Sequence, residues 1–294
     1  MNKNAEAWQI FRTWLFVGLK TSIQKLRRFF GENSKYVIGA ILLVVCLSAW
    51  LISSYILGCY RTKDLKHANI VRKDLKLAID IGHTKESHGA TSSRGVGEYY
   101  FNQDIAKLLQ LGLLQRGFTS TFILNENGSN ISLSMRTDLA KKQRARLLLS
   151  IHHDSVQPKY LQSWDYQEEE RLYCDLFQGY SIFYSEKNNA PRKSLQFATL
   201  LGKELRRNEF VPTLHHAEPI EGENRELVDK EEGIYRVDDF VVLKTAEMPA
   251  VLLECGVILN RDEEILLSNP VYRRVLVSSI INAIEIAVDK GIIE

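Results

Sequence analysis

The sequence predicts an α/β fold, in which a single domain with a mostly parallel, twisted sheet flanked by helices is preceded by one transmembrane helix. Two observations lead to this prediction. An uncharged, apolar stretch lies between Lys35 and Arg61. After residue 73, segments with strand and helix character alternate to the end of the chain, which is typical of a largely parallel sheet with crossover helices.

Residues 1–35 form a basic, amphipathic segment. They carry seven Lys or Arg side chains against two Glu, a net charge of +5. Apolar residues recur at helical spacing between Trp8 and Phe30. This pattern predicts a helix that lies on an anionic membrane leaflet. A short cytoplasmic helix packed against a partner is the alternative.

Residues 36–60 are expected to form the transmembrane helix, with its apolar part running from Val37 to about Gly58. A helix of this length crosses a hydrocarbon core of ~30 Å. Because positive flanks stay in the cytoplasm, we expect a single-pass protein of the inner (cytoplasmic) membrane with the rest of the chain in the periplasm. The apolar region is too long for a cleaved signal peptide. The segment ILGC, ending at Cys59, leaves lipoprotein processing as an alternative.

A polar stalk, residues 61–73, leads to the expected globular domain, residues 74–294. Subtracting the +5 of the N-terminal segment from the overall +2 leaves −3 for residues 61–294, which excludes a basic nucleic-acid-binding surface as the main feature. Cys174 and Cys255 form no CxxC pair. Two buried free thiols are expected, with one disulfide between them as the alternative.

The first half of the domain is expected to begin with a strand at Lys76–Ile81, which a loop rich in Gly, Ser and Thr follows. A helix from about Glu98 to Arg116 ends at Gly117, a residue type that commonly closes helices. A second strand is predicted at Thr119–Leu124. A second helix begins after Ser132, whose hydroxyl serves as its N-cap.

The second half continues the alternation. A polar loop is expected from Asp154 to Gln178, and proline in the first turn marks a helix that begins near Pro191. Short apolar runs predict the remaining strands and an amphipathic pattern predicts the last helix, namely strands at Arg146–His152, Ser181–Ser185, 240–244 and 249–256 and a helix at Pro270–Lys290.

Side chains able to bind a metal gather at the ends of these predicted elements. His83 follows the first strand, His152 ends the third and Glu254 lies near the end of the last, while Glu98 opens the first helix. In parallel α/β sheets the carboxyl ends of the strands share one edge, where ligands bind. Histidine with carboxylate is a common ligand set for catalytic zinc, which uses three protein ligands. Each residue alone has an ordinary structural explanation, so the prediction depends on their shared edge.

Four segments resemble the signature blocks of the zinc-dependent N-acetylmuramoyl-L-alanine amidase family (amidase type 3, cell-wall hydrolases). They read IDIGHT, SSRGVGEYYFNQDIA, LLLSIHHDS and MPAVLLECGVILN, and the resemblance extends from about Leu75 to the C-terminus. By position it implies that His83, Glu98 and His152 bind Zn2+ and that Glu254 is the catalytic base. It also implies that residues 74–294 are a zinc amidase domain that cleaves the amide between N-acetylmuramic acid and L-alanine of the peptidoglycan stem peptide.

The sequence departs from the family pattern at three places. The last block reads Glu-Cys-Gly-Val where Glu-Thr-Gly-Phe is more usual, a change that we expect to affect packing only. His153 stands where the family commonly has Ala, which leaves open an exchange of the ligand between His152 and His153, although strand alternation sends the two rings in opposite directions. The loop from Gln157 to Gly179 is longer than is typical, and in some relatives an inserted segment occludes the metal site. Here it is either a lid or a solvated surface loop.

Other functions stay open at this point. A membrane-tethered module that binds peptidoglycan or a partner with little turnover is one, and a zinc peptidase acting within stem peptides is another. A regulatory protein partner is compatible with each of these. Paired histidines argue against a glycosidase, which uses two carboxylates.

Overall fold

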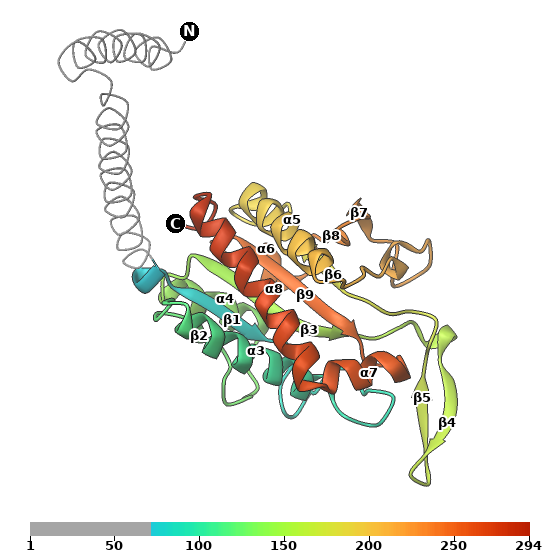
Figure 1. Cartoon of the computed structure of the whole chain (residues 1–294). Helices are drawn as coiled ribbons and strands as arrows, with labels where there is room; N and C mark the ends of the chain where they lie inside the picture. The colour runs from blue at the N-terminus through green and yellow to red at the C-terminus, as the bar shows by residue number, and fades with distance from the viewer. Residues whose placement is uncertain (1–71) are drawn as a thin grey trace, which may run out of the picture. The chain divides into compact units, whose positions relative to one another are not determined.

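The sheet has seven strands in the order β2-β1-β3-β9-β6-β8-β7 (Figure 1). The structure is a computed structural model and describes residues 72–294, so segments 1–35 and 36–60 and most of the stalk 61–73 lie outside the described residues. The strands of this sheet are β1 (Leu77–Ile81), β2 (Phe122–Ile123), β3 (Leu147–Asp154), β6 (Ser181–Tyr184), β7 (Glu226–Asp229), β8 (Ile234–Arg236) and β9 (Ala250–Val257).

Residues 69–294 form one compact unit, in agreement with the predicted single domain. In the part of the chain that the structure describes, no helix has both the length and the apolar character needed to cross a membrane. The predicted transmembrane helix at 36–60 falls outside this part and stays a prediction.

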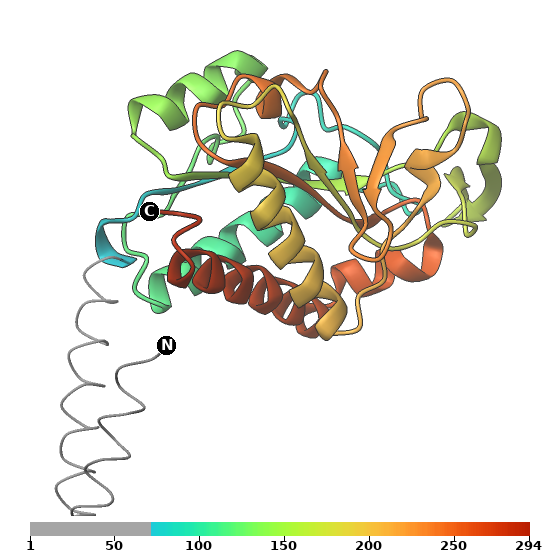
Figure 2. The ribbon, with the colours of Figure 1, turned by 90° about the horizontal axis from the view of Figure 1, so that it is seen from above.

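Helices cover both faces of the sheet (Figure 2). Three long helices, α3, α5 and α8, pack side by side on one face, and the shorter α4 and α6 pack on the other. A further helix, α7, lies between the end of β9 and α8. The helices are α3 (Glu98–Gln115), α4 (Leu133–Lys142), α5 (Pro191–Arg207), α6 (Val241–Lys244), α7 (Arg261–Ser268) and α8 (Pro270–Asp289).

The sheet has a hydrophobic core on each face, and neighbouring residues on the central strands point alternately into one core and the other. Leu149 and Leu253 belong to the larger core beneath α3, α5 and α8, whereas Leu148 and Leu252 belong to the smaller core beneath α4 and α6. This arrangement explains the almost continuous apolar runs, since a strand covered on both faces has no need of polar alternation. β3 and β9 run parallel, and His152 lies beside Glu254 in their register.

The sheet is mixed, so the prediction of a mostly parallel sheet is confirmed in part. The pairs β2–β1, β1–β3, β3–β9 and β6–β8 are parallel, whereas β6 runs antiparallel to β9 and β7 runs antiparallel to β8. No helix crosses the sheet between β3 and β6, so the chain starts β6 at the edge where β3 ended. A strand that begins there has to run back against its neighbour.

The predicted polar loop 154–178 contains an antiparallel hairpin, β4 (Gln162–Tyr166) and β5 (Glu169–Tyr173). Gln167 and Glu168 form its two-residue turn, and both have positive φ, 53° and 66°. Such turns usually carry Asn-Gly or Asp-Gly. The hairpin could therefore not be predicted from the Gln-Glu sequence of its turn.

The predicted strand at 240–244 is wrong, because these residues form the short helix α6. Val242 and Leu243 are both buried in the smaller core. Adjacent residues of a strand point to opposite faces, whereas the helical turn places both side chains against the same core. An apolar run of this length does not distinguish a helix from a strand by periodicity.

Other local predictions are confirmed. The Ser132 hydroxyl accepts a hydrogen bond from the Met135 amide at the start of α4, and Gly117 adopts a left-handed conformation (φ 90°) just after α3. Pro191 begins α5. Cys174 and Cys255 are buried free thiols.

Candidate metal centre

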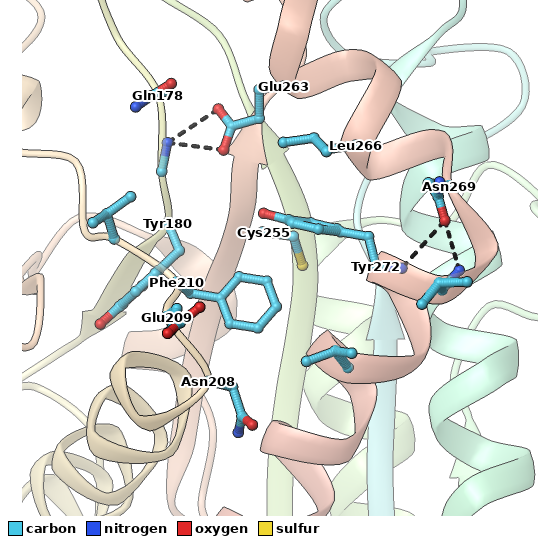
Figure 3. A pocket seen from close by; sticks show the side chains of 14 residues that line it. Gln178, Tyr180, Asn208, Glu209, Phe210, Cys255, Glu263, Leu266, Asn269 and Tyr272 are labelled. Carbon is cyan, nitrogen blue, oxygen red and sulfur yellow. Dashed lines mark hydrogen bonds between the residues drawn. The ribbon is translucent and has the colours of Figure 1, made fainter.

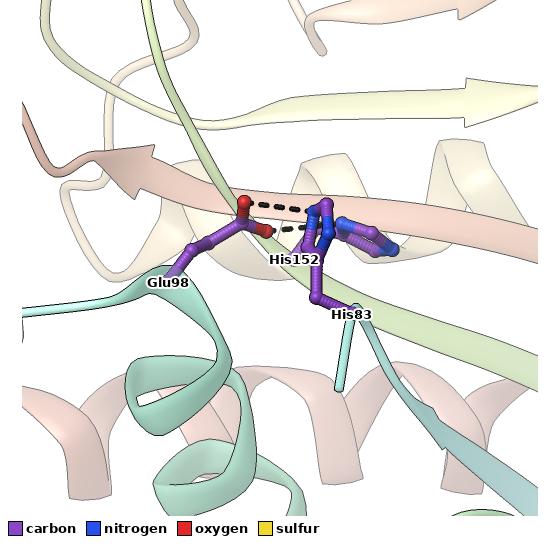
Figure 4. A group of neighbouring side chains, drawn as sticks. All are labelled: His83, Glu98 and His152. Carbon is purple, nitrogen blue, oxygen red and sulfur yellow. Dashed lines mark hydrogen bonds and ion pairs between the residues drawn. The ribbon is translucent and has the colours of Figure 1, made fainter. Parts of the chain in front are cut away.

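The structure brings His83, Glu98 and His152 together (Figure 4). His83 Nε2 lies 2.9 Å from Glu98 Oε2, and His152 Nδ1 lies 3.1 Å from Glu98 Oε1. One candidate ligand atom from each residue lies within 4.8 Å of the others. The three side chains come from the end of β1, the start of α3 and the end of β3, as the sequence predicts.

This donor set fits a zinc ion. Tetrahedral zinc with ligands at about 2.0–2.1 Å holds its ligand atoms about 3.4 Å apart. The two imidazole–carboxylate distances, 2.9 and 3.1 Å, are close to that spacing. Small side-chain rotations would therefore place all three donors around one cation.

A buried arginine holds the turn that carries His83. Arg136 of α4 pairs with Asp80 at 2.7 Å, with side chains only 2% and 1% exposed. Its guanidinium also donates to the carbonyl of Ile81 and, at 2.7 Å, to that of His83. His83 has φ 64°, a conformation that costs energy for a residue other than glycine. Arg136 therefore stabilises a strained backbone at the edge of the candidate site.

Two glycines leave room for these side chains. A Cβ at Gly82 would lie 2.5 Å from the His152 ring. Gly89 has φ 75°, and a Cβ there would lie 2.6 Å from the His83 ring and closer still to Glu98. Any larger residue at either position would displace a candidate ligand.

Glu98 is buried and receives hydrogen bonds from several elements. Ala90 and His153 donate their backbone amides, and Asn102, one helical turn along α3, donates its side-chain amide at 3.0 Å. Burial by itself raises the pKa of Glu98, but the hydrogen bonds and charges of His152 and His83 outweigh it and hold the pKa well below its usual range. Glu98 is therefore an anionic ligand.

His153 points away from this centre. It is fully buried on the opposite face of β3, where its Nδ1 lies 2.7 Å from Asn102 Oδ1 and its ring packs against Phe101. Burial lowers the pKa of His153 to about 3, with attraction to Glu98 opposing that shift. His152, not His153, lies in the group with His83 and Glu98, which is the arrangement that strand alternation favours.

Glu254 lies in the same cavity as the two histidines. This cavity has a volume of about 520 Å³, and its lining includes His83, His152 and Glu254 together with the apolar side chains of Leu133 and Leu252. Glu254 Oε2 is buried without a hydrogen-bond partner. Burial raises the pKa of Glu254 well above its usual value, and the charges of Asp154 and Glu98 raise it further.

A second cavity, of about 510 Å³, lies on the other side of β9 (Figure 3). Its lining includes Cys255, Tyr272 and Glu263, and the Glu263 carboxylate accepts hydrogen bonds from the Gly179 amide. Cys255 follows Glu254 in the strand and therefore faces the opposite way. No group of metal-binding side chains within residues 72–294 lies in this cavity. The candidate chemistry belongs to the first cavity.

The β4–β5 hairpin contacts the loop before α3 and contributes no side chain to the first cavity. Trp164 donates its indole N–H to the Ser93 carbonyl at 3.0 Å. Of residues 157–179, none lines the cavity that holds His83 and Glu254. In this conformation the hairpin is therefore not a cover over the site.

Sequence reasoning missed the residues that support the ligands. Asp80 lies inside an apolar run, and Asn102 lies four residues after Glu98 on the same helix face. Both positions carried a signal, since a polar residue in a buried segment needs a partner. Arg136 gave no such signal, because its helix is mostly polar.

Comparison with known proteins identifies the family to which the sequence is similar. The sequence profile of the family described as N-acetylmuramoyl-L-alanine amidase matches residues 77–286. A provisionally named N-acetylmuramoyl-L-alanine amidase of Buchnera aphidicola subsp. Baizongia pistaciae is 25% identical over 218 residues, which cover 69% of this chain and 92% of that protein.

Two solved structures share the fold. The N-acetylmuramyl-L-alanine amidase Ami1 of Mycobacterium smegmatis superposes with a TM-score of 0.58 at 21% identity and covers 74% of this chain and 98% of its own. The CwlD amidase of Clostridioides difficile, solved in complex with the GerS lipoprotein, has a TM-score of 0.51 at 19% identity and covers 74% of this chain and 100% of its own.

We expect Arg136→Met to destabilise the protein by about 3–5 kcal/mol, because it leaves the Asp80 carboxylate buried without its cation. Denaturant unfolding of the purified protein measures this loss. Lys141→Met is the control, since Lys141 and its partner Glu247 are both exposed, by 59% and 46%, and such pairs contribute about 0–1 kcal/mol. Equal losses for the two variants would contradict the role given to Arg136.

We expect Gly89→Ala to weaken metal binding at this centre by about 10–100-fold, as is typical when the surroundings of the ligands are disturbed. Titration with Zn2+ against a competing chelator measures the affinity. Gly291→Ala is the control, because Gly291 also has positive φ (66°) but a Cβ there meets nothing within 4 Å. An unchanged affinity in Gly89→Ala would show that the glycine does not make room for the ligands.

Proposed function

This chain belongs to the N-acetylmuramoyl-L-alanine amidase family and is a peptidoglycan amidase, and we propose that it works with a zinc ion held by His83, Glu98 and His152. The bond cleaved is the amide between N-acetylmuramic acid and L-alanine of the stem peptide. The observation that carries the proposal is the convergence of these three side chains at the cavity that also holds Glu254.

Zinc bound there would polarise the amide carbonyl and lower the pKa of water from 15.7 toward about 7, so that hydroxide is available at neutral pH. The protein has to supply a group that accepts the proton of water and delivers it to the leaving amine. Glu254 is the candidate, because its carboxyl lines the cavity and has a raised pKa that lets it hold a proton.

The lining of the cavity combines apolar and polar side chains, which suits an organic substrate with both kinds of group. Apolar side chains from α4 and α6, among them Leu133 and Val242, line it beside the polar groups. Binding sites of this composition hold a substrate by its apolar parts and orient it through a few polar contacts. The cleavable amide would then lie at the polar end, next to His83 and Glu254.

The proposal includes the place of the protein in the cell. The basic segment 1–35 and the uncharged segment 36–60 favour a single-pass anchor in the inner membrane with the N-terminus in the cytoplasm. Residues 74–294 would then lie in the periplasm, the compartment that contains the substrate. A regulatory protein partner remains part of the proposal, and the CwlD amidase, which has the same fold, was solved in complex with a lipoprotein.

We expect Glu254→Gln to keep its zinc and to lose about 10²–10⁴-fold in turnover, the range typical of a lost general base. His83→Ala should lose activity together with the zinc ion of this centre, because it removes a ligand. Turnover is measured on purified peptidoglycan, with mass spectrometry of the released peptides and metal analysis of each variant. Glu247→Gln, at an exposed glutamate outside the cavity, is the control and should be unaffected.

The products separate the alternatives. An amidase releases stem peptides with a free L-alanine N-terminus, whereas a peptidase acting within the stem leaves that amide intact. Intact peptidoglycan with normal zinc content would favour a binding module. Unchanged turnover in Glu254→Gln would refute the assignment of the base.

A further inference from the structure

A second group of histidine and carboxylate side chains lies at the end of β3. It consists of Asp154, the last residue of that strand, with His215 and His216 from the short 3-10 helix η3 (His215–Ala217). Their candidate ligand atoms lie within 4.8 Å of one another, as in the first group. None of the three lines the cavity that contains Glu254. The sequence analysis singled out none of them.

Both imidazoles present Nε2 to the same carboxylate oxygen. His216 Nε2 lies 2.8 Å and His215 Nε2 lies 3.3 Å from Asp154 Oδ2. The centroids of the two rings are only 4.1 Å apart. The two adjacent rings therefore converge on one atom of Asp154.

The opposite nitrogen of each ring is already held. His216 Nδ1 lies 2.9 Å from Glu223 Oε2, and His215 Nδ1 lies 2.8 Å from Thr213 Oγ1. Glu223 is itself fixed by the Gln157 side chain at 2.9 Å. Histidines that bind metals commonly donate Nδ1–H to a carboxylate or another acceptor, which turns the Nε2 lone pair toward the ion. Both rings have the supporting contacts of metal ligands.

His215 Nε2 has no hydrogen-bond partner. Its side chain is only 2% exposed, and Asp154 Oδ2, although 3.3 Å away, does not lie in hydrogen-bond geometry. A buried polar atom without a partner costs free energy. A cation between the two rings and the carboxylate would give this nitrogen a partner.

A hydrogen-bonded ion-pair network explains only half of the group. His216 lies between two carboxylates, with Nε2 2.8 Å from Asp154 Oδ2 and Nδ1 2.9 Å from Glu223 Oε2. Hydrogen bonds therefore account for the position of this ring without a metal. They do not account for His215, whose buried Nε2 has no partner.

We propose that Asp154, His215 and His216 form a second binding site for a divalent transition metal, most suitably zinc, separate from the centre at His83. Two imidazoles and one carboxylate are a ligand set that zinc accepts, with a fourth position for water. A cation here would replace the proton that links His216 to Asp154. It would fix η3 to the end of β3 and thus brace the chain beside the substrate cavity. This site does not depend on the amidase assignment.

Metal stoichiometry tests the proposal. The full-length chain, purified without a histidine tag and loaded with Zn2+ alone, should hold two zinc ions per chain by plasma mass spectrometry. His216→Gln and His215→Gln should each lower the content to one, and His83→Ala should also lower it to one. The combination of His216→Gln with His83→Ala should hold none. His88→Gln, at an exposed histidine outside both groups, should keep two.

Cobalt binding to the wild-type chain provides a second measurement, which does not depend on the folding of any variant. The variants then show which site each ion occupies. Co2+ titrated into the metal-free wild-type chain should give two saturable absorption changes. One ion that is lost in His83→Ala and kept in both η3 variants would overturn the second site and leave the amidase centre intact. One ion that is lost only in the η3 variants would support the second site and refute the first. No bound ion in any form would refute both.

Discussion

The guanidinium of Arg136 is the constraint on which the candidate site depends. It is almost completely buried, so the hydrogen bonds of its two terminal nitrogens are made within the protein. It neutralises Asp80 inside the sheet and holds the carbonyls of Ile81 and His83. Because the same group compensates a buried charge and fixes a strained turn, the packing of α4 on the sheet and the direction of His83 cannot vary independently.

Because side chains alternate along each strand, the candidate functional residues lie on one face of the sheet and their neighbours in sequence pack into the core on the other face. Asp80, His152 and Glu254 share the face covered by the short helices α4 and α6, which leave room for a cavity. The next residues, Ile81, His153 and Cys255, point into the thick core beneath α3, α5 and α8. A shift of one residue in β3 or β9 would therefore exchange a ligand or base for a core residue.

The ligand positions could be predicted from the sequence because they lie at the ends of regular elements. Strand ends are marked by the change from apolar to polar residues, and Glu98 is marked as the start of a helix. The hairpin at Gln167 and α6 could not be predicted, since one has an unusual turn sequence and the other is too short to show a period. Contacts across long separations, such as Arg136 with Asp80 or His216 with Asp154, depend on the tertiary fold and leave no local signal.

The distribution of charge in the interior distinguishes Glu254 from the other acids near it. Glu98 is balanced by His83 and His152, and Asp154 by the η3 histidines. Glu254 forms no ion pair within residues 72–294, and its Oε2 has no hydrogen-bond partner. A carboxyl group in this situation gains and loses a proton more readily than one held as a permanent anion. The pattern of pairing therefore separates the carboxylates of the two proposed ligand groups, which have partners, from the proposed base, which has none.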